Sequence, residues 1–276
     1  MISRQSMSFF AYNTYNRSPM LSPSFASSVS NRLFSRLERR NFLSGASSLP
    51  ALVPPPAKED EGKLCVVLDM DETLVHAVFS SGKDYRQAED RQTHNESASS
   101  SFTITLPSDA SGPAEDVQIF TRPGLQNLLH HLHSNNFEPI LFTAALPVYA
   151  NPVLDYIDQN RVFRARLFRD STVHCQGYPY VKDIRMLGRD MKRVVIVDNN
   201  PSAMLATVDN AIPIKDFYGD KNDSEFDHLI KLLDHLEKLE DVRPFLKQLL
   251  QFGRKTGLES DLRVDVAYND TPASKL

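Results

Sequence analysis

Short apolar runs alternate along this chain with segments in which apolar residues recur at helical spacing. Continuous runs predict buried strands at 64–68, 139–143, 162–168 and 193–198. The helical spacing predicts helices at 125–132, 147–157 and 226–236, and a last helix from Asp241. Strands that alternate with helices in this way are typical of an α/β fold built on a parallel sheet.

A different pattern follows the first strand. Residues 80–100 are polar and lack periodicity, which predicts a mobile insertion. Residues 101–106 then alternate between apolar and polar, and 117–120 can pair with them. We expect a small β-hairpin flap there, over the first strand–helix junction, and no large capping domain. An uncapped crevice would suit a bulky substrate, such as a phosphorylated side chain on another protein.

Length and charge restrict the classes of partner. The chain has 276 residues, 41% of them hydrophobic, a net charge of −4 and a pI near 6.1. A nucleic-acid-binding domain would be expected to be basic, so we expect no direct contact with nucleic acid. No stretch approaches the roughly 20 apolar residues that cross a bilayer, so no transmembrane segment is predicted. We expect a monomer.

The first fifty residues differ from the rest: they hold six arginines, one acidic residue and no lysine. This composition is typical of an organellar transit peptide, and 31–42 can form a basic amphipathic helix. A disordered regulatory tail is an equal alternative. Pro54-Pro55-Pro56 predicts a stiff linker, so folded structure should begin near Lys63. The expected division is a disordered segment 1–60, a folded domain 61–252 and a flexible tail 253–276.

Two carboxylates stand directly after the first strand, in Asp69-Met70-Asp71-Glu72-Thr73. Asp69 and Asp71 would share a face in extended backbone, at the strand end where open α/β sheets bind ligands. Two like charges this close need a cation or a shared proton. Oxygen ligands favour Mg²⁺. Taken alone, the pair could equally be two solvated turn residues.

Three further features follow other strands or loops: Thr143, Lys182, and the pair Asp198-Asn199. Each has an ordinary explanation by itself, as a strand threonine, a surface lysine and a turn. Together with the aspartate pair they supply a hydroxyl, a compact positive charge and oxygen ligands, in a fixed order along the chain. Their order favours one shared site.

This order resembles the haloacid dehalogenase superfamily of phosphotransferases, and within it the FCP-homology phosphatases, the small C-terminal-domain phosphatases that act on the RNA polymerase II tail. The resemblance covers about 63–252, with Met70 where the family usually has leucine. It rests on these segments: Asp69-Met70-Asp71-Glu72-Thr73-Leu74-Val75-His76, Arg122-Pro123-Gly124, Leu141-Phe142-Thr143-Ala144, Phe163-Arg164-Ala165-Arg166-Leu167-Phe168-Arg169, Tyr180-Val181-Lys182-Asp183 and Val197-Asp198-Asn199-Asn200-Pro201.

The resemblance implies a Rossmann-like, haloacid dehalogenase-like fold and a Mg²⁺-dependent protein serine/threonine phosphatase that forms an aspartyl-phosphate. The implied roles are a nucleophile (Asp69), a general acid and base (Asp71), phosphate binding (Thr73, Thr143 and Lys182, with Thr73 bracing the catalytic loop), metal ligation (Asp69, the Asp71 carbonyl and Asn199, supported by Asp198) and a substrate groove (Phe79, Tyr149 and Arg169).

Other functions stay open at this stage. The second hypothesis is a non-catalytic scaffold, because a subunit of the mitochondrial import translocase carries the same domain. A phosphatase for small metabolites is the third, and the lack of a large cap argues against it. The resemblance favours the nucleus or cytoplasm, while the N-terminal composition favours a mitochondrion or another organelle.

Overall fold

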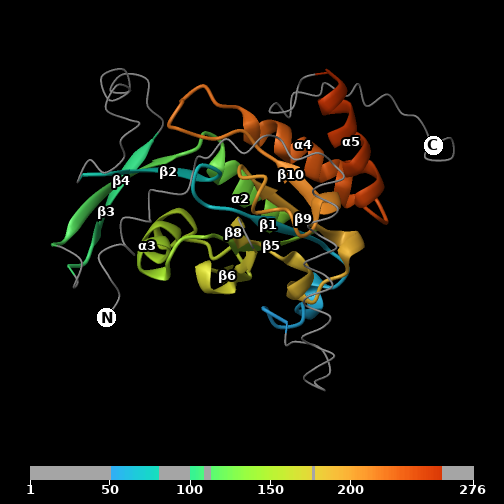
Figure 1. Cartoon of the computed structure of the whole chain (residues 1–276), viewed down its shortest axis with the longest axis horizontal. Coiled ribbons are helices and arrows are strands. Elements are labelled where there is room, and N and C mark those ends of the chain that lie inside the picture. The colour runs from blue at the N-terminus through green and yellow to red at the C-terminus, as the bar shows by residue number, and fades with distance from the viewer. Residues whose placement is uncertain (1–50, 81–99, 109–112, 176–177, 257–276) are drawn as a thin grey trace.

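The structure, a computed structural model, describes residues 51–80, 100–108, 113–175 and 178–256. Its centre is a five-stranded parallel sheet in the order β10-β9-β1-β5-β6 (Figure 1). The strands are β1 (Leu64–Leu68), β5 (Phe137–Phe142), β6 (Ala165–Leu167), β9 (Val194–Asp198) and β10 (Ala211–Pro213). The expected α/β fold with a parallel sheet is confirmed.

Alternate residues of β1 point to opposite faces of this sheet, and both faces are buried. Leu64, Val66 and Leu68 belong to the larger core cluster, which the apolar faces of the four α-helices in the described residues complete. These helices are α2 (Leu125–Ser134), α3 (Pro147–Ile157), α4 (Glu225–Glu237) and α5 (Arg243–Thr256). A strand that is buried on both faces explains why Leu64–Leu68 is continuously apolar.

The second face carries a thinner layer. Cys65 and Val67 pack there against a short 3-10 helix, η4 (Ile184–Leu187), and against Val53. Val53 is buried, and the amide of Leu52 donates to the Met186 carbonyl at 2.7 Å. This segment, which precedes the expected start of folded structure near Lys63, therefore packs on part of one face of the sheet.

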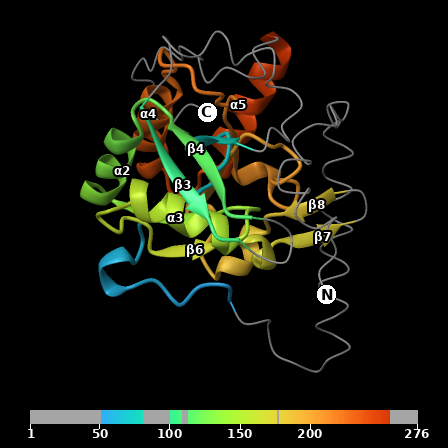
Figure 2. The same cartoon turned by 90° about the vertical axis from the view of Figure 1, so that its left-hand side faces the viewer.

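The flap is an antiparallel sheet of three strands, β2 (Val75–Phe79), β4 (Glu115–Thr121) and β3 (Ser101–Leu106), in the order β2-β4-β3. The expected hairpin of β3 and β4 is confirmed, and β2 adds a strand that the sequence pattern did not predict. In Figure 1 the flap lies at the left of the molecule and α5 at the right; in Figure 2 the strands β3 and β4 face the viewer.

Several bounds differ from those expected. The strand predicted at 162–168 is only the three residues of β6, and α5 continues past Gly253 to Thr256. A two-stranded sheet of β7 (Val173–Cys175) and β8 (Tyr178–Val181) was not predicted. The predicted helix at 31–42, most of the insertion at 80–100 and the tail from 257 lie outside the described residues. No helix in the described part is long and apolar enough to cross a membrane.

Candidate active site

The aspartate pair lies at the carboxyl end of β1, where the chain turns sharply toward the flap. The amide of Asp69 still donates to the Val197 carbonyl of β9, at 3.0 Å. The turn that follows is closed by the amides of Leu74 and Val75, which both donate to the Met70 carbonyl. Glu72 has a φ of +56°, a left-handed conformation that is uncommon for residues other than glycine. Such strain is often found at functional sites.

Lys182 joins two of the predicted site residues. Its ammonium group donates to a carboxylate oxygen of Asp69 and, at 2.6 Å, to Asp198. Burial alone would lower the pKa of Lys182, but the charges of Asp198 and Asp69 raise it above its ordinary value. Burial and the charge of Asp69 in turn raise the pKa of Asp198, against the opposing effect of Lys182. The lysine is therefore a charged group inside the site and not a surface residue.

Asp71 lies in a different environment from Asp69. The hydroxyl of Tyr149, in the first turn of α3, donates to Asp71 Oδ1 at 2.6 Å. Burial, followed by the charge of Glu72, raises the pKa of Asp71 to about 8, although the hydrogen bond from Tyr149 opposes this shift. A pKa of about 8 leaves Asp71 largely protonated at neutral pH.

Tyr149 is expected to line an apolar substrate groove, and its hydroxyl makes a further contact. The residue is 3% exposed, and its hydroxyl faces Asp71. Its ring lies 6.0 Å from the ring of Phe79, which is only partly buried. Phe79, at the end of β2, thus contacts the α3 residue that binds Asp71.

Thr73 connects Asp69 with the loop after β9. Its hydroxyl lies 3.3 Å from both Asp69 Oδ2 and Asn199 Oδ1. The side-chain amide of Asn199 in turn donates to Asp216 Oδ1 at 2.9 Å, which turns the Asn199 oxygen toward Asp69. Thr73 is fully buried, so its hydroxyl braces these two oxygens within the protein.

This arrangement fits a divalent cation that prefers oxygen ligands. The available donors are a carboxylate oxygen of Asp69, the amide oxygen of Asn199 and the backbone carbonyl of Asp71. In the described part of the chain no three His, Cys, Asp or Glu side chains form a metal cluster. A cation here would therefore depend on the Asn199 amide and on backbone oxygen as well as on carboxylate.

Thr143 follows β5, the strand that pairs with β1 with Leu141 beside Leu68. This register puts Thr143 at the same sheet edge as the aspartate pair. Its hydroxyl accepts a hydrogen bond from the Ala145 amide at 3.0 Å, and its own hydrogen can still be donated to a ligand. Arg169 is anchored close by: its Nε donates to the Ala144 carbonyl at 2.6 Å, and its guanidinium lies 4.8 Å from the Tyr180 ring centre.

The sequence assigned no role to Arg122, which supports the turn after β1 through a hydrogen bond to its backbone. Its buried guanidinium donates to the Thr73 carbonyl at 3.1 Å, to the Lys215 carbonyl and, through two nitrogens, to Asp223. It thereby ties the turn after β1 to the loop between β10 and α4. The bidentate pair with a carboxylate suits arginine and not lysine.

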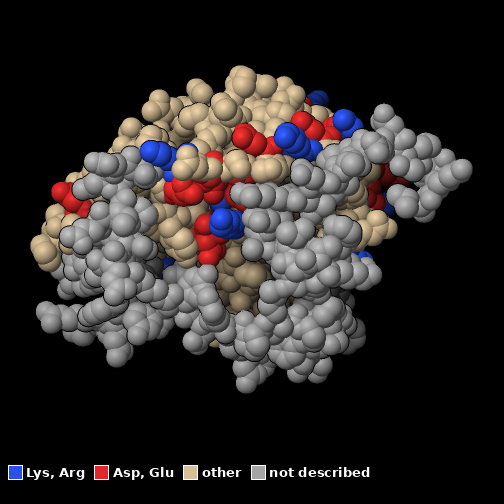
Figure 3. All heavy atoms as spheres, turned by 90° about the horizontal axis from the view of Figure 1, so that it is seen from above, with Lys and Arg blue, Asp and Glu red and all other residues tan. Residues whose placement is uncertain are grey.

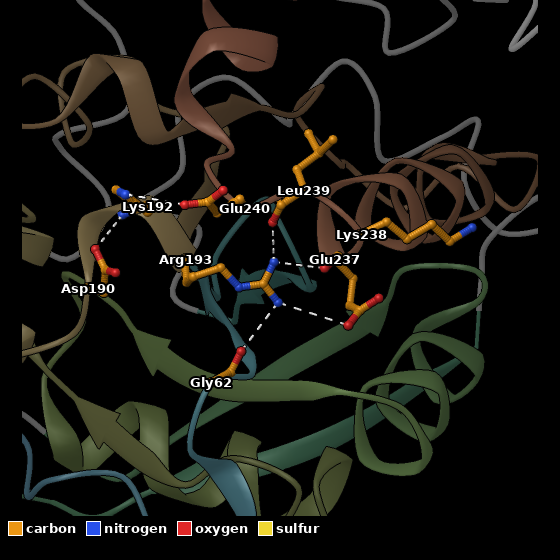
Figure 4. Close-up of a pocket in the computed structure, with 8 residues that line it drawn as sticks. All are labelled: Gly62, Asp190, Lys192, Arg193, Glu237, Lys238, Leu239 and Glu240. Carbon is orange, nitrogen blue, oxygen red and sulfur yellow. Dashed lines mark hydrogen bonds and ion pairs between the residues drawn. The ribbon is translucent and has the colours of Figure 1, made fainter. Parts of the chain in front are cut away.

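The opposite edge of the sheet has its own hollow, of about 420 Å³ (Figure 4). It lies where β1 and β9 begin and is centred on Arg193, which donates to the carbonyls of Glu237 and Leu239 at the end of α4 and to that of Gly62. Arg193 is thus engaged in holding α4 against the sheet. The remaining lining residues are Asp190, Lys192, Lys238 and Glu240.

Comparison with known proteins gives one family. The family described as NLI interacting factor-like phosphatase matches residues 64–243. A human protein, carboxy-terminal domain RNA polymerase II polypeptide A small phosphatase 2, is 38% identical over 198 residues, which are 72% of this chain and 66% of that protein. An uncharacterized protein of Schizosaccharomyces pombe is 39% identical over 195 residues, 71% of this chain and 54% of its own length.

The chain therefore spans between about half and two thirds of the length of these two relatives. A solved structure of Fcp1, titled an essential RNA polymerase II CTD phosphatase, shares the fold. It aligns with a TM-score of 0.51 at 16% identity, covering 83% of this chain and 70% of that one.

Proposed function

Because the chain belongs to the NLI interacting factor-like phosphatase family, we propose that it is a Mg²⁺-dependent phosphatase that acts on phosphoserine or phosphothreonine in proteins. One observation carries the proposal. Asp69 is held by the ammonium of Lys182, whereas Asp71, two residues away, is held by a phenol and is largely protonated at neutral pH. A carboxyl group paired with a cation and a second one held by a phenol and largely protonated are the two environments that a nucleophile and a general acid require.

The residues would divide the reaction as follows. The Asp69 carboxylate attacks phosphorus and forms an aspartyl-phosphate, while the proton of Asp71 passes to the departing oxygen. Asp71, now a carboxylate, accepts a proton from the water that breaks the new bond. Lys182 and the Thr143 hydroxyl would hold the phosphoryl oxygens. Bound Mg²⁺ would neutralise phosphate charge, held by Asp69, Asn199 and the Asp71 carbonyl, with Asp198 keeping Lys182 in place.

We propose a phosphoprotein as the substrate class because the flap is a small sheet of only three strands. A flap of this size leaves room for a bulky substrate at the carboxyl edge of the central sheet. The names of the relatives make the RNA polymerase II tail one candidate. Phe79 and Arg169 are the proposed groove residues: one is aromatic and partly buried, and the other is a cation bound to the carbonyl of Ala144, the residue after Thr143.

The test is hydrolysis of para-nitrophenyl phosphate and of a phosphoserine peptide by the purified chain, with Mg²⁺ and with EDTA. We expect turnover that needs Mg²⁺, and we expect Asp69→Asn to lower it by at least about a thousandfold while the protein stays folded. Asp209→Asn, an exposed aspartate in a short 3-10 helix, is the matched control and should keep full activity.

Full Mg²⁺-dependent turnover by Asp69→Asn would contradict this mechanism. An inactive but folded wild-type chain would instead favour the scaffold reading, and faster turnover of sugar phosphates than of phosphopeptides would favour a metabolite phosphatase.

A further inference from the structure

The hydroxyl of Tyr149 has a place in the site that groove-lining does not explain. We propose that Tyr149 is a positioning residue for the general acid: it holds one oxygen of Asp71, so that the acidic proton lies on the other oxygen, Oδ2. This inference rests on the proposed phosphatase function and adds a residue to it. Its test concerns the leaving-group step, in which Asp71 gives up its proton.

The phenol is held rigidly on three sides. Tyr149 lies in the first turn of α3, where its amide and that of Ala150 donate to the Leu146 carbonyl at 3.1 and 3.0 Å. Its ring packs in the main core cluster and faces Phe79 of the flap strand β2. Because the backbone and the ring are both fixed, the position of the hydroxyl is fixed as well, 2.6 Å from Asp71 Oδ1.

A hydrogen bond of this kind decides which carboxyl oxygen is the acid. A phenol is an O–H donor at neutral pH, and a carboxyl oxygen that accepts from it is the one without a proton. The proton of Asp71 is then on Oδ2. Asp71 lies in the turn after β1, and Tyr149 orients its carboxyl group from α3.

In the first step an oxygen of Asp69 forms a bond to phosphorus and the bond from phosphorus to the substrate oxygen breaks. The electron pair of that broken bond takes the proton from Asp71 Oδ2, and Asp71 becomes a carboxylate. The hydrogen bond from Tyr149 is then charge-assisted and stronger, so it favours proton release. In the second step a proton returns from water to Asp71, while the water oxygen displaces Asp69 from phosphorus.

This role makes a specific kinetic prediction. A good leaving group, such as para-nitrophenolate, departs with little help from an acid, whereas a poor one, such as phenolate, depends on it. Tyr149→Phe keeps the ring and removes only the hydroxyl. We expect kcat for phenyl phosphate to fall about tenfold or more, kcat for para-nitrophenyl phosphate to fall less than about threefold, and KM to change little for both.

The matched control is Tyr156→Phe. Tyr156 lies two turns further along α3, is 52% exposed and stacks on Phe102 at 3.6 Å, so loss of its hydroxyl should change neither rate. Asp71→Asn should show the same selective loss for the poor leaving group. The double variant Tyr149→Phe/Asp71→Asn should add no further selectivity, because both changes act on one proton.

An equal loss for both substrates, or a rise in KM alone, would overturn the positioning role and leave the phosphatase function standing. A wild-type chain that hydrolyses neither substrate would overturn both. Thermal unfolding of each variant, measured beside the kinetics, separates a folding defect from a catalytic one, since a loss of folded protein lowers both rates by the same factor.

Discussion

At the scale of single residues, the oxygen atoms of the site are oriented by hydrogen bonds from residues that surround it. Asn199 shows this most clearly. Its amide nitrogen donates to Asp216 and its oxygen faces the Thr73 hydroxyl, so the amide has one orientation that satisfies both ends. Tyr218 donates to the other oxygen of Asp216 at 3.3 Å. Asp216 therefore directs the Asn199 oxygen toward the proposed cation and adds a negative charge nearby.

Asp216→Asn should weaken Mg²⁺ binding. The change removes the charge and offers an amide that can also present a donor to Asn199, so the Asn199 oxygen is no longer fixed. Partners of metal ligands are typically worth 10–100-fold in affinity, and we expect about a tenfold rise in the Mg²⁺ dissociation constant. Isothermal titration calorimetry on the unreacted protein measures it directly.

The control for this change lies in the same loop. Asp220 is exposed, and its side chain accepts a hydrogen bond from the Asn222 amide at 2.9 Å, which Asn can accept as well. Asp220→Asn should bind Mg²⁺ as the wild type does. Equal dissociation constants for the two variants would show that Asp216 has no part in metal binding.

At the scale of elements, periodicity predicted those with a clear pattern. The expected helix at 147–157 has the observed bounds of α3, and β1, β3 and β9 lie where apolar runs or alternation put them. The missed strands lacked such a pattern. The strand β2 follows the turn of the aspartate motif directly and carries His76 among apolar residues, and β10 has only three residues. Both are defined by pairing with a neighbour and not by their own sequence.

The same distinction separates the parts of the site. Asp69, Thr143, Lys182 and Asn199 could be predicted as candidates because each stands at the end of a strand or in a motif. Tyr149, Arg122 and Asp216 act through contacts between segments far apart in the chain, which spacing does not reveal. One signal existed for Asp216: it follows β10, at the same sheet edge, but that strand was too short to be recognised.

The segment just before β1 also depends on a contact between elements. Asp60 ends the short helix η1 (Lys58–Asp60), and it is buried between Lys63 at 2.8 Å and Arg164 at 2.9 Å, just before β1 and β6. Burial alone would raise its pKa, but the hydrogen bonds and charges of these two partners lower it below the ordinary value.

A lowered pKa in the folded state gives the sign of a pH effect. The stabilisation by Asp60 is complete above the unfolded-state pKa of about 3.9, and it is lost as the pH falls toward the lower pKa of the folded state. Asp60→Asn should therefore reduce the free energy of unfolding by about 1–3 kcal/mol at pH 7, and by less at pH 3.5. Urea unfolding at pH 7, 5 and 3.5 measures the difference.

Asp155→Asn is the control for this pH series. Asp155 pairs with Arg166 at 2.6 Å, but its side chain is 70% exposed. Exposed pairs contribute little, so this variant should lose at most about 1 kcal/mol. A deficit for Asp60→Asn that stays constant from pH 7 to 3.5 would argue that its charge does not stabilise the fold.

At the scale of the whole molecule, the two edges of the sheet have separate tasks. The carboxyl edge carries the proposed chemistry, and the opposite edge holds α4 in place through Arg193. On the face seen in Figure 3, basic and acidic side chains lie among one another over the described surface. This mixed surface agrees with the small net charge of −4.

The two faces of the sheet are covered unequally, and this makes the segment before β1 part of the fold. Helices cover one face, while Val53, η4 and the partly buried Leu52 cover the other. Val53 is 4% exposed, so Val53→Ala in the full chain removes buried apolar surface and leaves a small cavity. We expect a loss of about 1.5–3 kcal/mol in the free energy of unfolding, measured by urea denaturation.

Val148→Ala provides the same chemical change at a site that is 45% exposed, in the first turn of α3. It should change the free energy of unfolding by no more than about 0.5 kcal/mol. If Val53→Ala were equally mild, the segment 51–57 would be an attached linker, as the proline run suggested. A clear difference between the two valines would instead place the start of the folded domain before Val53, because only a residue inside the core can cost this much.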